Sequence, residues 1–258
     1  MSVATNHRIA GVRLRVLALA IAPVLAGSGA AAAIGPVSWW RLAFALVVAV
    51  SVQLGAHAPR PYSLVAFGVT GAAGLVLAAA TTWWLVPLGA AGVLAAWTYH
   101  HGPWPYGGKA LGEVALLVFS GFVATAGTAY VGAGRLTRLA EGVSLPVGLM
   151  AVAALIAKNL RDLPIDAAAG RRTLAVALGD ALNRTFYLGC VLAVGLATAA
   201  VSISRPGAML GLASGPLLLA PIRSVVTGQS GMALSRVVTG TTQAAVLYAA
   251  LLGLGLAL

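Results

Sequence analysis

Long runs of hydrophobic residues dominate this chain, and the polar positions fall mainly between them. A run of about 17 to 22 mostly apolar residues can cross a bilayer as a helix. Such runs cover residues 14–34, 39–56, 64–81, 83–99, 110–131, 143–157, 181–201, 208–226 and 237–258. No linker or repeat divides them. The pattern therefore predicts an all-α fold, a polytopic transmembrane helical bundle of about nine helices that forms a single domain over residues 1–258.

Composition excludes the other broad classes. Only 8% of the residues are charged and 60% are hydrophobic, with a mean hydropathy of +0.96. A water-soluble domain carries about 25% charged residues, because polar groups must cover its surface. Cys190 is the single cysteine, which excludes a disulfide scaffold. The chain is therefore expected to have the lipid bilayer as its solvent.

The charge balance sets the orientation. The chain has 16 basic and 5 acidic residues, a net charge of +11. If the N-terminus is cytoplasmic, every basic residue except Arg41, Arg135, Arg138 and Arg205 falls on the cytoplasmic side. Nucleic acid is therefore not needed as a partner to explain the charge. Because arginine far outnumbers lysine and alanine and glycine abound, we expect a multi-pass protein of a bacterial inner (plasma) membrane.

The longest non-apolar stretch, residues 158–180, holds three of the five acidic residues. Within it, Asn159, Asp162 and Asp166 are three and four positions apart. If the sixth run continues as a helix, this spacing places their oxygen atoms on one face. Pro164 predicts that the helix is interrupted or restarted there.

These residue types suit a divalent cation and a polyanion together. Mg²⁺ takes oxygen ligands and usually binds through one or two carboxylates plus substrate phosphates. Asp162 and Asp166 supply the carboxylates, while Arg161, Arg171 and Arg172 can bind phosphate oxygens bidentately. The stretch therefore predicts a diphosphate site at the cytoplasmic surface. The alternative is a solvated loop whose charges only determine how the protein is oriented in the membrane.

The run from Asn159 to Gly179 also resembles the second aspartate-rich motif of the UbiA superfamily of membrane prenyltransferases. It is most similar to the members that prenylate 1,4-dihydroxy-2-naphthoate in menaquinone synthesis. Further similarity lies in Pro105-Tyr106-Gly107, Gly112-Glu113-Val114, Phe119, Gly121 and Gly127-Thr128.

The resemblance implies a Mg²⁺-dependent transfer of a polyprenyl group from polyprenyl diphosphate to an aromatic acceptor, 1,4-dihydroxy-2-naphthoate. By matching position, Asp162 and Asp166 would be the catalytic residues and would hold Mg²⁺ with Asn159. The diphosphate would be bound by Asn159, Arg161, Arg171, Arg172 and Thr173.

The chain departs from this family in the loop between the second and third runs. The family carries a first aspartate-rich motif there, but residues 56–61 read Ala-His-Ala-Pro-Arg-Pro, and no Asp or Glu precedes Glu113. The loop is also shorter than the family's by some tens of residues. Lys158 stands where the family usually has asparagine.

A missing carboxylate cluster removes the anchor of one metal ion. His57 and Arg60 can contact phosphate but are poor ligands for a hard cation. The resulting hypothesis is that this chain is a weak or inactive prenyltransferase. The alternatives are a catalytically inactive homologue and a membrane carrier or scaffold.

Overall fold

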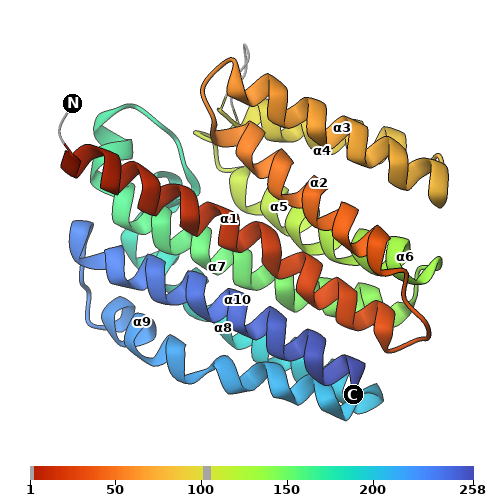
Figure 1. The fold of residues 1–258 in the computed structure, drawn as a ribbon. Coiled ribbons are helices and arrows are strands. Elements are labelled where there is room, and N and C mark those ends of the chain that lie inside the picture. Colours follow the sequence, from red (N-terminus) through yellow and green to blue (C-terminus); the bar gives the residue numbers. More distant parts are fainter. Residues whose placement is uncertain (1–2, 101–105) are drawn as a thin grey trace.

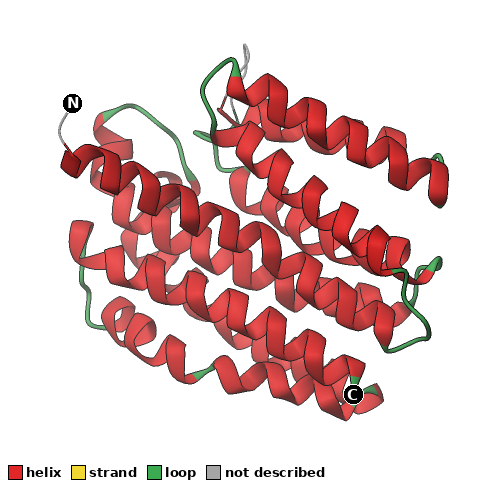
Figure 2. Cartoon of the chain, in the orientation of Figure 1, coloured by secondary structure: helices red, strands yellow, loops and turns green. Residues whose placement is uncertain are grey.

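The structure is a computed structural model that describes the backbone of residues 3–100 and 106–258 and the side chains of residues 17–99 and 106–258. Helices account for nearly all of the described chain, which contains no strand (Figures 1 and 2). The prediction of an all-α bundle is confirmed.

The helices follow the predicted apolar runs closely. They are α1 (Val3–Ala32), α2 (Trp39–His57), α3 (Tyr62–Ala80), α4 (Leu85–His100), α5 (Gly112–Leu116), the π-helix η1 (Leu117–Ala126), α6 (Gly127–Ala133), α7 (Arg138–Ala168), α8 (Leu174–Ser204), the 3-10 helix η2 (Pro206–Ser214), α9 (Pro216–Val226), the 3-10 helix η3 (Gly231–Leu234) and α10 (Ser235–Ala257).

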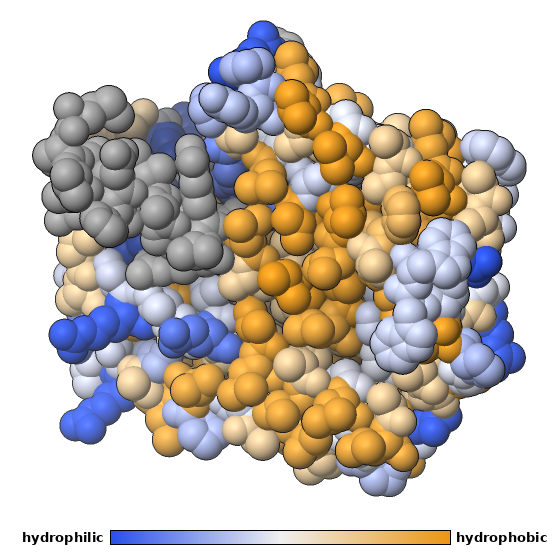
Figure 3. Space-filling model, in the orientation of Figure 1, coloured by the Kyte–Doolittle hydropathy of each residue, from blue (hydrophilic) through white to orange (hydrophobic). Residues whose placement is uncertain are grey.

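Most of these segments meet the requirements for crossing a membrane. Among the described residues, six helical stretches are long and apolar enough, and η2 with α9 form a further one that is bent by 53°. Two shorter apolar helices, Leu17–Ala32 and Leu85–Tyr99, complete the set of nine predicted runs. The two termini lie at opposite ends of the bundle (Figure 1), as an odd number of crossings requires. The face in Figure 3 is apolar across its middle, with hydrophilic residues toward the edges.

The prediction that the helix is interrupted or restarted at Pro164 is wrong. Helix α7 continues through this residue to Ala168, and the loop before α8 shrinks to residues 169–173. Proline removes one N–H donor from the helix, but the turns after it still close, because the Ala169 N–H donates to the Ile165 carbonyl at 3.0 Å, a distance typical of a helix. The polar residues 159–166 therefore belong to the last turns of one long helix.

Helix α7 lies at the centre of the bundle. It packs against α8, α10, α1 and η1, and 67% of its most apolar window is buried inside the protein, compared with 22% for α8. A helix surrounded on most sides has a fixed rotation about its axis. The direction in which each residue at its C-terminal end points is therefore determined by the core.

Candidate functional site

A cavity of about 1020 Å³ opens between α1, α2, α3, α4, η1 and α7. Its walls are mainly apolar, with side chains such as Val48, Phe67, Phe119 and Val123. Hydroxyl side chains of Thr70, Ser120, Thr128 and Thr242 lie along these walls. The larger polar side chains come from the C-terminal ends of α2, α4 and α7 and from the loops beyond α4 and α7: they are Gln53, His57, Tyr99, Tyr106, Lys158, Arg161 and Arg171. Because α2, α4 and α7 run in the same direction, these residues gather at one end. The cavity suits a long apolar ligand with an anionic head.

Two of the cationic residues are bound to Asp162. Arg161 grips both carboxylate oxygens, with Nε 2.7 Å from Oδ1 and Nη2 2.9 Å from Oδ2. The Lys158 Nζ lies 3.5 Å from Oδ2. Arg161 and Lys158 line the cavity, whereas Asp162 does not. Asp162 was predicted to bind a metal ion, but both of its carboxylate oxygens are thus paired with basic side chains.

Asp166 lies deeper and is only partly satisfied. Its side chain is 5% exposed, and Oδ1 lies 3.2 Å from Nη1 of Arg171. Oδ2 is buried and has no hydrogen-bond partner. The Arg171 backbone N–H donates to the Asp166 carbonyl at 2.9 Å, which folds the loop back over the helix end. A buried carboxylate oxygen without a partner is unfavourable unless a ligand completes it.

Asn159 makes a buried contact that its spacing from Asp162 and Asp166 did not predict. Its Nδ2 donates to Oε1 of Glu113, at the start of α5, over 2.8 Å, and both side chains are buried. Glu113 is the only acidic residue in its apolar run, and this rarity was the available signal, since ionisable groups inside a span are costly without a partner.

The other predicted diphosphate ligands have structural contacts. The Arg172 N–H donates to the Gly108 carbonyl at 2.8 Å, while its side chain is exposed. Thr173 is the buried N-cap of α8, and its hydroxyl accepts from the Val176 N–H at 3.5 Å. Of the predicted site residues, only Arg161 and Arg171 line the cavity.

The loop after α2 contributes no carboxylate to the cavity end. Gln53 and His57 line the cavity there, with the His57 Nδ1 3.0 Å from the Gln53 carbonyl oxygen. Arg60 is exposed and does not line it. In the loop after α4, the Tyr106 hydroxyl donates to the Ala95 carbonyl at 3.0 Å, and burial raises the pKa of Tyr106. This tyrosine is therefore a neutral donor that helps close the loop on α4.

The residues present fit one divalent cation rather than two. In residues 3–100 and 106–258, no three or more His, Cys, Asp or Glu side chains come together as a metal cluster. Asp166 Oδ2 is one buried oxygen without a partner, and Asp162 supplies a second carboxylate only if Arg161 and Lys158 move away. One or two carboxylates with phosphate and water are sufficient for Mg²⁺.

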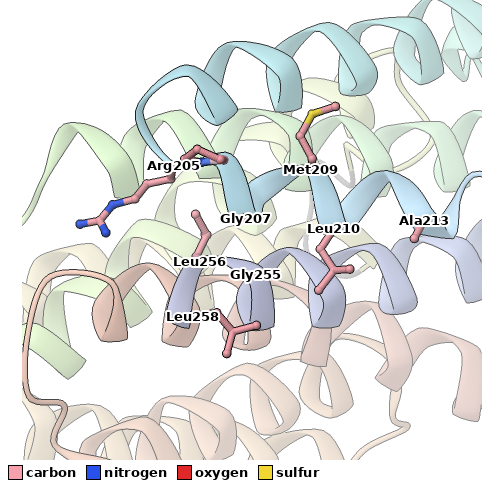
Figure 4. Close-up of a pocket in the computed structure, with 9 residues that line it drawn as sticks. Arg205, Gly207, Met209, Leu210, Ala213, Gly255, Leu256 and Leu258 are labelled. Atoms are coloured by element: carbon pink, nitrogen blue, oxygen red, sulfur yellow. The ribbon is translucent and has the colours of Figure 1, made fainter.

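A smaller cavity of about 680 Å³ lies at the other end of the bundle, between η2 and the end of α10 (Figure 4). Met209, Leu210 and Leu256 form much of its lining. The Arg205 guanidinium points away from it in Figure 4 and donates to the Ala33 carbonyl at 2.7 Å. Arg205 is thus the one charged residue in the lining of this cavity, and its guanidinium is already bound to a backbone carbonyl.

Comparison with known proteins identifies the family. The model of the UbiA prenyltransferase family matches residues 60–238. The chain is 34% identical to the 1,4-dihydroxy-2-naphthoate octaprenyltransferase of Mycobacterium tuberculosis, over 93% of each chain, and 34% identical to that of Mycobacterium leprae, over 93% of this chain and 92% of the relative. The protein of the same name in Escherichia coli is 33% identical over 66% of this chain and 56% of its own.

The alignment with the M. tuberculosis relative runs over 272 positions, more than the 258 residues of this chain, so the relative has residues that this chain lacks. This agrees with a shortened chain. The matched length and identity settle the family, and the helical bundle with its apolar cavity agrees with them: the chain belongs to the UbiA prenyltransferase family.

Proposed function

We propose that this prenyltransferase moves a polyprenyl group from polyprenyl diphosphate to 1,4-dihydroxy-2-naphthoate, a step of menaquinone synthesis, with its site on the cytoplasmic side of a bacterial inner membrane. The observation that carries the proposal is the amphiphilic cavity, which has apolar walls and the cations Lys158, Arg161 and Arg171 at one end. The shared name of its relatives supports this acceptor.

The chain's own residues account for binding and for the exclusion of water. The three cations contact the diphosphate, and the apolar walls hold the isoprenoid and keep water from the allylic carbon. When bound through Asp166 and Asp162, Mg²⁺ would stabilise the negative charge on the leaving diphosphate.

The transfer balances without a further reactant. The allylic C–O bond breaks, and its electron pair leaves with the diphosphate. The electron-rich ring carbon that bears the carboxylate forms the new C–C bond. That carboxylate leaves as CO₂, and its electron pair restores the aromatic ring. The cations at the cavity end favour cleavage of the C–O bond, because negative charge develops on the diphosphate as it leaves.

Turnover by the purified protein tests the proposal. In detergent, with a polyprenyl diphosphate, 1,4-dihydroxy-2-naphthoate and Mg²⁺, we expect a prenylated naphthalene, formed more slowly than by the M. tuberculosis relative assayed in parallel. Asp166→Asn should lower the rate by at least about a hundredfold, or about 3 kcal/mol of transition-state stabilisation.

The matched control is Glu141→Gln, which neutralises an exposed carboxylate in the first turn of the same helix α7 and should keep the wild-type rate. Product formation by wild type at no more than the rate of Asp166→Asn would reject the proposal. It would favour an inactive homologue or a carrier instead.

A further inference from the structure

The polar end of the cavity contains two cations and one carboxylate that already satisfy one another. Arg161 and Lys158 together occupy both oxygens of Asp162. The Arg161 and Asp162 side chains are 19% and 21% exposed, so water screens this pair only partly. A metal ion approaching Asp162 must therefore displace Arg161, which makes two short, charge-assisted hydrogen bonds, and Lys158, whose Nζ lies 3.5 Å from Oδ2.

The protein alone offers a metal ion very little. Among the described residues there is no metal-ligand cluster, and Asp166 Oδ2 is the one carboxylate oxygen that is buried without a partner. The N-terminal half cannot compensate, because no Asp or Glu precedes Glu113. Mg²⁺ prefers a full shell of oxygen ligands, so a single free oxygen predicts weak binding.

A diphosphate would change both the pairing of Asp162 with its two cations and the shortage of oxygen ligands for a metal ion. It offers oxygen acceptors to Arg161 and Lys158, which line the cavity where its anionic end would lie. When these cations turn to the phosphate, Asp162 is released, and the phosphate supplies further oxygen ligands. Metal and diphosphate then each improve the site for the other.

We propose that Arg161 and Lys158 form a latch on Asp162 that the diphosphate opens, so that metal and diphosphate bind with strong positive coupling. The proposal rests on the diphosphate site of the proposed function. It adds that this chain does not bind its metal ion tightly before the diphosphate arrives. By thermodynamic reciprocity, each ligand must raise the affinity for the other by the same factor.

Equilibrium dialysis tests the latch without any turnover. The purified protein in detergent is dialysed against Mn²⁺ alone, against inorganic pyrophosphate alone, and against both together, and each bound ligand is measured. For wild type we expect weak binding of Mn²⁺ alone, measurable binding of pyrophosphate alone, and an increase in both affinities of about tenfold or more when they are combined.

Variants of the latch should act in opposite directions. Lys158→Gln and Arg161→Gln release Asp162, so Mn²⁺ alone should bind about fivefold or more tightly and pyrophosphate alone more weakly. Asp162→Asn releases the cations, so pyrophosphate alone should bind more tightly while the coupling is lost. Because a misfolded protein does not gain affinity, the gains keep the test decisive even if one variant is unstable.

The matched control is Arg223→Gln, which removes one exposed positive charge at the same end of the bundle and should leave all affinities unchanged. The proposal is overturned if wild type binds Mn²⁺ equally well with and without pyrophosphate, or if the latch variants bind Mn²⁺ like wild type. Coupling without prenyl transfer would reject the proposed function alone, whereas prenyl transfer without coupling would reject the latch alone.

Discussion

At the scale of single residues, the hydrogen bond between Asn159 and Glu113 fixes one predicted ligand in place. The carboxamide donates its N–H to Oε1 of Glu113 at 2.8 Å. An amide held in this way has its nitrogen committed to α5, so any ligand of Asn159 would be bound by the amide oxygen. Glu113 is therefore a positioning residue that acts through Asn159, one turn before Asp162.

Removing this acceptor should destabilise the protein. Glu113→Ala leaves the buried Asn159 amide without a partner, and we expect the free energy of unfolding to fall by about 1–3 kcal/mol. Glu113→Gln keeps an acceptor oxygen and should cost less. Thermal unfolding in detergent measures both, with the exposed Glu141→Ala as control. Equal losses for Glu113→Ala and Glu113→Gln would contradict a role in accepting the Asn159 hydrogen bond.

At the scale of elements, the contact between η1 and α7 depends on two glycines. A Cβ atom added at Gly148 would lie 2.8 Å from the Gly121 Cα and 2.8 Å from Cδ1 of Leu117. The helix backbones therefore touch where these residues cross, as small residues permit in membrane proteins. This contact fixes η1, which carries Phe119 and Val123 of the cavity wall, against the helix that carries the polar residues.

Gly148→Ala should force η1 and α7 apart and lower the free energy of unfolding by about 1–3 kcal/mol. Gly189→Ala is the matched control, because a Cβ added at that exposed position of α8 meets nothing within 4 Å. It should leave stability unchanged or raise it by up to about 1 kcal/mol through helix propensity. Thermal unfolding in detergent compares the two, and an unaffected Gly148→Ala would show that the helices do not approach this closely.

The apolar runs predicted the elements well, because a bilayer span has to be apolar over most of its length. Breaks within elements were harder to predict. Pro164 proved compatible with α7. The positions of the nine apolar runs predicted neither the 53° bend between η2 and α9 nor the π-helical turns in η1. Such local departures depend on neighbouring helices, which a single run of sequence does not specify.

At the scale of the whole molecule, the sequence predicted a polar cluster at the end of one helix but not the pairs that its side chains form. Residue types and spacing predicted oxygen ligands on one face beside three arginines. They could not predict that Asp162 would be held by Arg161 and Lys158, that Asn159 would bond to Glu113, or that Thr173 would cap α8. These pairings depend on the rotation of α7 in the bundle and on how the loop after it folds back.

The orientation of the whole bundle is the remaining prediction from sequence, and it can be tested with single cysteines. Cys190 is the only cysteine and is buried, so Cys190→Ala gives a cysteine-free background. In this background, Ala169→Cys introduces a thiol at the exposed loop after α7, and Leu136→Cys introduces one at the exposed loop before it. Because α7 separates these loops, they must lie on opposite sides of the membrane.

The excess of basic residues near Ala169 predicts that this loop is cytoplasmic. A membrane-impermeant maleimide should therefore label Leu136→Cys in intact cells but not Ala169→Cys, and the reverse should hold in inverted membrane vesicles. Labelling of Ala169→Cys from outside would place the latch and the diphosphate site on the wrong side for a soluble cytoplasmic acceptor. That result would force a revision of the proposed orientation while leaving the helical fold intact.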